Sequence, residues 1–164
     1  MKLISPIQFA EAFRRNEMIV KLQTRGLSDE DGFIQLPFRA NCLNWTIGHL
    51  LTNRAEILRL LTDEAPGWTE KIARYKRESE PVTGPAAGVL SLAELLELLD
   101  RSQNEINEAL VRVTEDQIEE EIAFIGDTPQ SRADWLFFFL FHDSYHTGQT
   151  EILRQAAGVN DKVI

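Results

Sequence analysis

Apolar residues recur at the three- and four-residue spacing of amphipathic helices, and this pattern predicts four long helices. The first covers residues 6–25, with Ser5 as its N-cap, Pro6 in the first helical position and Gly26 as its stop. The second ends near residue 62 and begins at Asn41 or Asn44, both of which are good N-cap residues.

The second half of the chain supplies the other two helices. One runs from Ser91 to about Val113, and Ser91 with Glu94 forms a capping-box pattern. A weaker pattern predicts a short helical turn over residues 114–121. The last helix spans residues 131–157, and its most apolar run, residues 135–141, indicates a helix buried on nearly every side.

Residues 63–88 contain several prolines and glycines, and a connection this long is uncommon inside a compact domain. It is either a lid or binding loop or a solvated excursion. Residues 69–80 could form a short charged helix within it, and Trp68 is expected to contact apolar neighbours. With no convincing strand, the sequence predicts an all-α, up-and-down four-helix bundle with a long loop between the second and third helices, as a single domain over residues 1–164.

The composition and net charge of the chain limit the classes of partner and the cellular setting that we expect. The formal net charge of −9 argues against a nucleic-acid partner, because phosphate binding relies on Lys and Arg contacts. The charge fits a protein that acts on small molecules. Cys42 is the single cysteine, which excludes an intramolecular disulfide, and the N-terminus does not resemble a secretion signal, so we expect a cytoplasmic protein. The apolar run 135–141 is far too short to cross a bilayer, so no membrane partner is expected.

The chemistry centres on the three histidines of the chain. His142 and His146 are four residues apart on one predicted helix, so their imidazoles project from the same face. His49 lies on a second apolar helix and could reach the same point. Three neutral imidazoles suit Zn²⁺ or a neighbouring divalent ion with one position open for water or substrate. The alternative is that these histidines are packed or surface residues without a metal.

The residue after the first histidine of the pair argues against a zinc protease. In the H-E-x-x-H signature a glutamate there acts as general base, whereas this chain has Asp143, one methylene shorter. Other residues could support the site or serve only the fold. Asn53 and Glu56 could orient an imidazole or lie at the surface, and Gln149 could cap the site or bond across helices.

Three further residues near the histidines have open roles. Gly148 would permit close helix packing. Tyr145 could donate a proton to a substrate or lie buried with a satisfied hydroxyl. Cys42 could approach the metal or behave as a small hydrophobic residue.

Two motifs together resemble those of the DinB-like superfamily. They are N-x-x-N-W-x-x-G-H-L at residues 41–50 and H-x-x-x-H-x-G-Q at residues 142–149, and the resemblance covers nearly the whole chain. It implies a four-helix bundle, commonly a homodimer, that binds a divalent metal such as nickel or zinc through the residues matching His49, His142 and His146.

Similarity to family members that act as thiol S-transferases implies a small-molecule substrate, including a low-molecular-weight thiol. A divalent ion would lower the pKa of a thiol or a water beside it, so thiol transfer and hydrolysis are both open. The remaining alternative is a bundle that binds metal or a ligand without turnover, for instance as a stress-response protein. The resemblance to these family members favours thiol transfer over hydrolysis.

Overall fold

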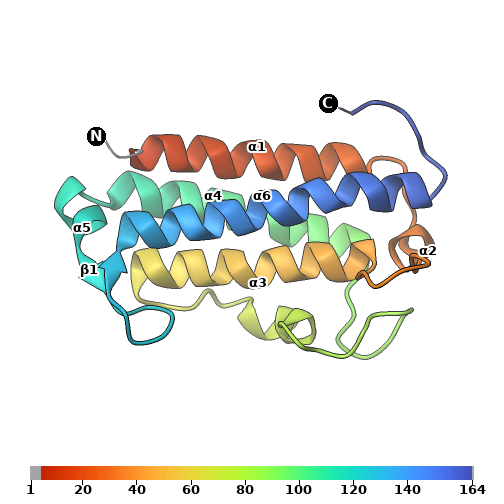
Figure 1. The fold of residues 1–164 in the computed structure, drawn as a ribbon, viewed down its shortest axis with the longest axis horizontal. Helices are drawn as coiled ribbons and strands as arrows, with labels where there is room; N and C mark the ends of the chain where they lie inside the picture. The colour runs from red at the N-terminus through yellow and green to blue at the C-terminus, as the bar shows by residue number, and fades with distance from the viewer. Residues whose placement is uncertain (1–4, 164) are drawn as a thin grey trace.

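Four long helices lie side by side in the computed structural model, which describes residues 5–163 (Figure 1). They are α1 (Pro6–Thr24), α3 (Leu43–Thr62), α4 (Leu92–Arg112) and α6 (Arg132–Ala156). The smaller elements are the short helices α2 (Asp29–Gly32) and α5 (Glu115–Glu119), the 3₁₀ helix η1 (Thr69–Tyr75), and the two-residue strands β1 (Glu121–Ile122) and β2 (Gln130–Ser131). The predicted all-α bundle is thus confirmed.

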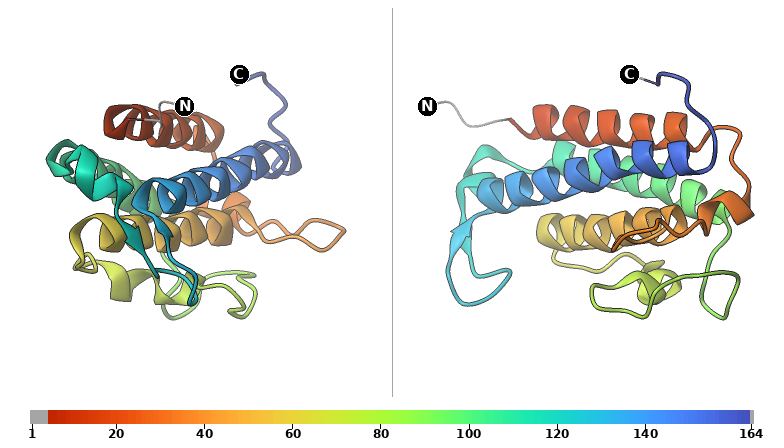
Figure 2. Two further views of the ribbon diagram at one scale, coloured as in Figure 1. Left: turned by 60° about the vertical axis from the view of Figure 1, so that its left-hand side comes forward. Right: turned by 45° about the vertical axis from the view of Figure 1, so that its right-hand side comes forward.

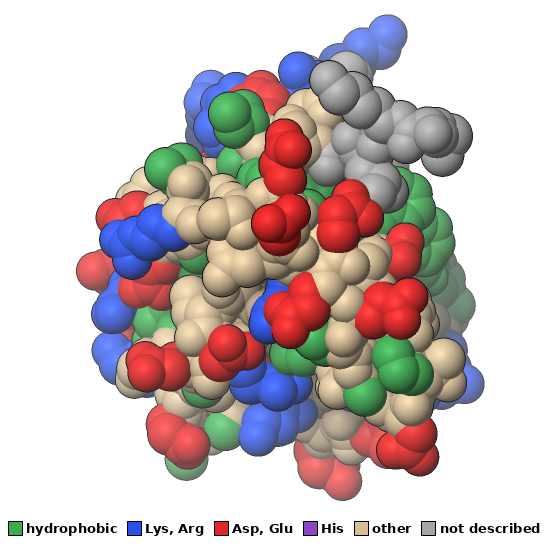
Figure 3. Space-filling view, turned by 90° about the vertical axis from the view of Figure 1, so that its left-hand side faces the viewer, with side chains coloured by type: hydrophobic (Ala, Val, Ile, Leu, Met, Phe, Trp, Pro, Cys, Tyr) green, Lys and Arg blue, Asp and Glu red, His purple; other side chains and the backbone are tan. Residues whose placement is uncertain are grey.

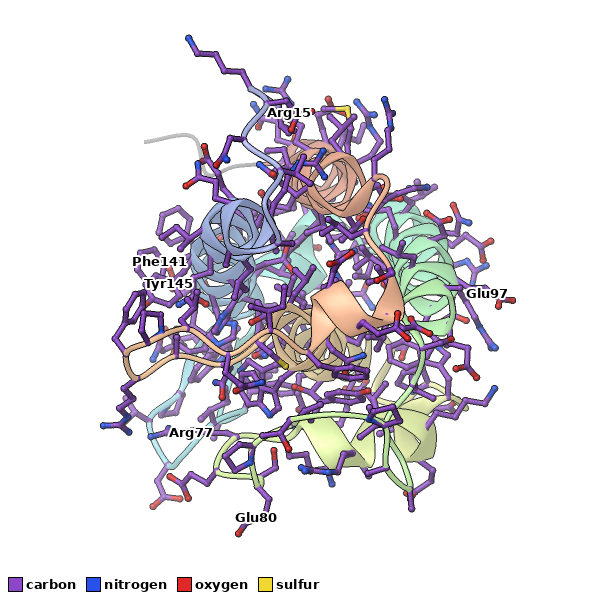
Figure 4. All side chains as sticks on the ribbon, turned by 90° about the vertical axis from the view of Figure 1, so that its right-hand side faces the viewer. Arg15, Arg77, Glu80, Glu97, Phe141 and Tyr145 are labelled. Atoms are coloured by element: carbon purple, nitrogen blue, oxygen red, sulfur yellow. The ribbon has the colours of Figure 1, made fainter. Side chains whose placement is uncertain are left out.

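Each long helix packs against two others. Both α1 and α3 contact α4 and α6, so the four helices form a closed ring in cross-section, as the end-on view shows (Figure 4). Helices α1 and α6 run in one direction, and α3 and α4 run in the other (Figures 1 and 2). The bundle therefore departs from a simple up-and-down order at one connection. The long segment between α3 and α4 returns along the bundle, so these two consecutive helices run in the same direction.

Three of the four long helices begin at a serine whose side chain caps the helix, and α3 is the exception. Ser5 with Gln8, and Ser91 with Glu94, form complete capping boxes at α1 and α4. The prediction of an asparagine N-cap for α3 was wrong. Cys42 occupies that position without a side-chain cap bond, and Asn44 instead donates to the carbonyl oxygen of Leu90 at 2.8 Å.

The apolar run of α6 is buried on one face only, which corrects the predicted burial on nearly every side. Trp135, Leu136 and Phe139 lie in the core. Phe137 and Phe138, in contrast, are exposed. The helical period explains the difference, since residues 135, 136 and 139 share the face that packs against the bundle.

The segment between α3 and α4 packs onto the bundle rather than extending into solvent. Trp68 and Tyr75 are almost completely buried, and the Trp68 indole donates to the carboxylate of Glu105 at 2.9 Å. The predicted apolar surroundings of Trp68 are confirmed, because both it and Ile72 belong to the core cluster.

A small antiparallel ladder, β1 with β2, closes the loop before α6 and corrects the prediction of no strand. Acidic side chains are spread over the end of the bundle where this ladder lies, with basic ones between them (Figure 3). Among residues 5–163 no helix has the length and apolar character needed to cross a membrane.

Candidate metal centre

The three histidines meet at one point between α3 and α6. The ring centroid of His49 is 5.2 Å from that of His142 and 4.9 Å from that of His146, and the latter two are 4.5 Å apart. One ring nitrogen from each histidine lies within 4.8 Å of the other two. Nitrogens that each lie about 2 Å from one ion are at most about 4 Å apart, so a small inward movement of the rings would let them hold a single cation.

Local helix geometry produces this convergence. His142 and His146 are one turn apart on α6, and His49 projects from the facing helix α3. Trp45, one turn before His49, stacks on its imidazole with centroids 4.5 Å apart and an interplanar angle of 17°. The indole Nε1 is itself held by Ser79 at 3.0 Å, so the stacked pair is fixed from outside the bundle.

Hydrogen bonds orient two of the rings. His49 Nδ1 lies 3.0 Å from the backbone carbonyl oxygen of Tyr75, which can only accept, so Nδ1 carries the proton and Nε2 keeps its lone pair. His146 Nδ1 is 2.7 Å from Gln149 Oε1, which fixes its tautomer in the same way. Metal-ligating histidines commonly hold their second nitrogen by such contacts.

The third ring, that of His142, differs from the other two in its hydrogen bonding. His142 Nδ1 is buried and has no hydrogen-bond partner among residues 5–163. A buried polar atom left without a partner costs about 1–3 kcal/mol, and coordination of a cation through that nitrogen would satisfy it. The donor set of three imidazoles and this unpartnered nitrogen together fit a divalent transition-metal ion.

The electrostatics keep all three rings in the form that binds metal. Burial lowers the pKa of His142 to about 4, and the neighbouring His146 and His49 add to the effect. Burial also lowers the pKa of His49 and His146, although the bond to Gln149 opposes the shift at His146. The imidazoles are therefore neutral at physiological pH, and a neutral imidazole is the ligating form.

A glycine on α3 allows η1 to pack close to that helix, and η1 ends with Tyr75, whose carbonyl oxygen orients His49. A Cβ atom at Gly48 would lie 2.2 Å from the ring of Tyr75, so only glycine allows this close approach. The Tyr75 hydroxyl also donates to Asn44 Oδ1 at 3.1 Å and accepts from the Leu90 amide at 2.7 Å. These contacts fix η1 against α3 and place the Tyr75 carbonyl beside His49.

A buried ion pair ties the histidine-bearing helices to the rest of the bundle. Arg54 on α3 and Asp143 on α6 are each about 1% exposed and pair at 3.2 Å. Arg54 also donates to Gln103 on α4 and to the carbonyl oxygen of Phe13 on α1, and Asn16 donates to Asp143 at 2.9 Å. Asp143 is thus committed to the core through its contacts with Arg54 and Asn16.

The predicted supporting residues divide into two groups. Asn53 lies near His49 Nε2, at 3.5 Å, and Gln149 contacts His146. Glu56 instead pairs with Arg59 at 2.6 Å, and Cys42 Sγ contacts the carbonyl oxygen of Val82 at 3.1 Å, so neither belongs to the histidine cluster.

Two predictions for α6 were wrong. A Cβ at Gly148 would meet no atom of the described residues within 4 Å, so this glycine is not needed for close packing between the described helices. Tyr145 is 59% exposed rather than buried, although its ring packs edge-on against His146 at 5.3 Å.

Trp45 and Gly48 are specified positions of the motif at residues 41–50, but the sequence analysis gave them no role in the site, and it did not identify Tyr75 at all. Trp45 could have been recognised from its position one turn before His49. Gly48 is an isolated glycine in a helical pattern, which usually has a packing reason. The Tyr75 carbonyl has no such signal, because any residue presents a backbone oxygen.

The chain and its fold are similar to those of known proteins. A family model of the DinB superfamily matches residues 12–150. Among solved structures, a conserved protein from Enterococcus faecalis superposes with a TM-score of 0.72 at 19% sequence identity, covering 91% of this chain and 94% of that one. At this identity the likeness supports the fold alone. No curated protein matches the chain.

Proposed function

The chain belongs to the DinB superfamily, and from this membership and the geometry of its three histidines we propose that it is a divalent-metal-dependent enzyme acting on small molecules, with thiol S-transferase-type chemistry. The observation that carries the proposal is the convergence of three neutral imidazoles, one of which has a buried nitrogen without a partner. Zinc and nickel are the metals we propose, because both accept imidazole ligands.

The residues of the chain would bind and orient rather than react. His49, His142 and His146 would hold the ion, with the first fixed by the Tyr75 carbonyl and the third by Gln149. A divalent ion bound by neutral ligands supplies uncompensated positive charge, which lowers the pKa of a thiol or water beside it. Because no protein carboxylate belongs to the three-histidine group, that charge would not be neutralised by its ligands.

Thiol transfer is favoured over hydrolysis by the resemblance of the two histidine-bearing motifs to family members with that activity. The cytoplasm is the setting we propose, since low-molecular-weight thiols are kept reduced there. Tyr145 lies at the exposed side of the cluster, against His146, and could contact a substrate at that position.

Metal binding is the first test. Purified metal-free protein is titrated calorimetrically with Zn²⁺ and with Ni²⁺, beside His49→Ala, His142→Ala and the matched control Gln155→Ala, which is an exposed residue of the same helix as His142. We expect one ion per chain in the wild type and in the control, and at least a tenfold weaker affinity in each histidine variant. Equal affinity in all four proteins would contradict the site.

Turnover is the second test. The loaded protein is assayed with a panel of low-molecular-weight thiols and an aryl halide electrophile, and in parallel with simple ester and amide substrates. We expect thiol conjugation that depends on the metal and is lost in His49→Ala. Metal binding without any turnover would instead support a non-catalytic binding protein, and ester cleavage alone would support a hydrolase.

A further inference from the structure

The residues that follow η1 border the histidine cluster and are tied to it on both sides. The Tyr75 carbonyl oxygen lies 3.0 Å from His49 Nδ1, and Ser79 Oγ accepts a hydrogen bond from the Trp45 indole at 3.0 Å. Trp45 in turn stacks on the imidazole of His49. We call residues 76–79 the site turn. Because both flanking contacts lead to His49, the site turn is held beside that ring.

The backbone of the site turn is strained. The Ser79 amide donates to the Lys76 carbonyl oxygen at 3.1 Å, which closes a tight turn. Glu78, the third residue of this turn, has a φ of 65°, a conformation that glycine or asparagine normally supplies at this position. Strained residues of this kind persist only where their surroundings hold them, and they gather at ligand sites. The strain therefore marks the site turn as a place to look for a bound group.

A neighbouring arginine braces the site turn from its other side. The Arg74 guanidinium donates to the carbonyl oxygen of Glu80 at 2.6 Å and to that of Pro81 at 3.1 Å. The segment thus closes on itself immediately after the site turn. Side chains carried by the turn are therefore presented on a backbone that is already ordered before any ligand binds.

Arg77, the second residue of the site turn, brings a positive charge to the cluster. Its side chain is 87% exposed, and its nearest carboxylate, that of Glu78, lies 3.7 Å away, which is longer than a hydrogen bond. The guanidinium is therefore available to another anion. Burial is the main cause of the lowered pKa of His49, and the positive charge of Arg77 adds to the lowering, so this charge acts at the ring.

The cluster lies between this cation and an exposed aromatic side chain. Tyr145 packs edge-on against His146 at 5.3 Å, and Arg77 lies on the same side of the bundle as Tyr145 in the end-on view (Figure 4). A chain of net charge −9 repels small anions over most of its surface, whereas Arg77 attracts them at the cluster. The planar fork of a guanidinium matches a carboxylate in particular.

We propose that Arg77 determines substrate specificity by binding a carboxylate of the molecule that occupies the histidine cluster, so that the preferred substrate is a small thiol carrying a carboxylate. This inference rests on the proposed function, because it takes the cluster as the place where the substrate binds. The substrate carboxylate would replace that of Glu78 as the partner of Arg77, and the braced site turn would hold the guanidinium in place for it.

Two probes that differ only in charge test the proposal. Mercaptoacetate and its neutral methyl ester are titrated calorimetrically into the Zn²⁺-loaded wild type, Arg77→Gln and Lys76→Gln. We expect Arg77→Gln to weaken mercaptoacetate binding by about fivefold, the scale of an exposed ion pair, and to leave the affinity for the ester unchanged. Lys76→Gln is the matched control, because this exposed neighbour loses the same charge and should keep both affinities. Comparing variants cancels the intrinsic difference between the two thiols.

Two further variants separate the charge of Arg77 from a structural role. Glu78→Gln removes the competing carboxylate and should strengthen mercaptoacetate binding. Arg77→Lys should retain part of the preference, since an ammonium keeps the charge without the planar fork, and the preference should weaken as salt is added. Equal mercaptoacetate affinity in the wild type and Arg77→Gln, an equal loss for both probes, or no binding of either probe would overturn the proposal.

The same titrations on metal-free protein distinguish this inference from the proposed function. We expect both probes to bind more weakly there, with the preference for mercaptoacetate retained and still dependent on Arg77. That result without any metal-dependent turnover would support the role of Arg77 and count against the enzyme. Metal-dependent thiol conjugation in which Arg77→Gln leaves the KM for mercaptoacetate unchanged would support the enzyme and overturn the role of Arg77. Circular dichroism checks that each variant is folded.

Discussion

His49 depends on a residue that none of the four long helices supplies. Its orientation comes from the carbonyl oxygen of Tyr75, and Tyr75 can approach α3 only because residue 48 is glycine. The candidate site is therefore formed by the three histidines, but the orientation of His49 within it depends on close packing between α3 and η1.

The close approach at Gly48 leads to a first prediction. Gly48→Ala would place a methyl group 2.2 Å from the Tyr75 ring, so η1 must move. We expect a loss of about 1–3 kcal/mol in the free energy of unfolding, as for other overpacked sites. Urea denaturation of the metal-free protein measures it. Gly84→Ala, where a Cβ meets open space, is the control, and a similar loss in both variants would contradict the account.

The buried imidazoles lead to a second prediction. His142 has a pKa of about 4 in the folded protein against 6.5 as its ordinary value, so between these pH values the unfolded chain binds more protons than the folded one. The free energy of unfolding of the metal-free protein should therefore fall as the pH drops from 6.5 towards 4, and this group should have no effect above that range. The fall between pH 7.5 and 5 should be smaller in His142→Asn, as measured by urea denaturation. An equal or larger fall in the variant would count against burial as its cause.

At the scale of elements, the four long helices are joined by one buried network. Arg54 of α3 reaches Asp143 of α6, Gln103 of α4 and the Phe13 carbonyl of α1. This network fixes α6 relative to α3 one residue away from His142. The position of the three histidines thus depends on a charge pair that lies outside the histidine cluster.

Breaking this pair gives a third prediction. Asp143→Asn removes the negative partner of a buried guanidinium, and such a change is expected to cost about 3–5 kcal/mol of unfolding free energy. Chemical denaturation measures it. The exposed pair Arg101–Glu105 serves as a control, and Arg101→Gln should cost less than about 1 kcal/mol. The double variant Arg54→Leu with Asp143→Leu should recover much of the loss, whereas additive losses would contradict the pairing.

Whether a feature of these elements could be predicted depends on how far apart in the sequence the contacting residues lie. The helix starts at Ser5 and Ser91 follow from residues three apart and were predicted correctly. The start of α3 was not, because Asn44 bonds to Leu90, 46 residues away. The convergence of the histidines followed from helical spacing, but the Tyr75 and Arg54 contacts join residues 26 and 89 positions apart and leave no local pattern.

At the scale of the whole molecule, metal binding should stabilise the fold. The three histidines come from two helices that are far apart in sequence, so the unfolded chain cannot bring them together in the same way. An ion present at 100 times its dissociation constant should add about 2.7 kcal/mol to the free energy of unfolding. Thermal melts with and without Zn²⁺ measure the effect. The gain should vanish in His49→Gln and remain in Gln155→Ala, and a gain in His49→Gln would point to binding elsewhere.

The segment that crosses back from α3 to α4 can alter the geometry of the histidine cluster without a change to any of the three histidines. It contributes no histidine, yet its Tyr75 carbonyl decides how one imidazole is presented. A protein engineer could therefore lengthen or shorten residues 76–88 to turn the His49 imidazole while leaving the helical scaffold intact.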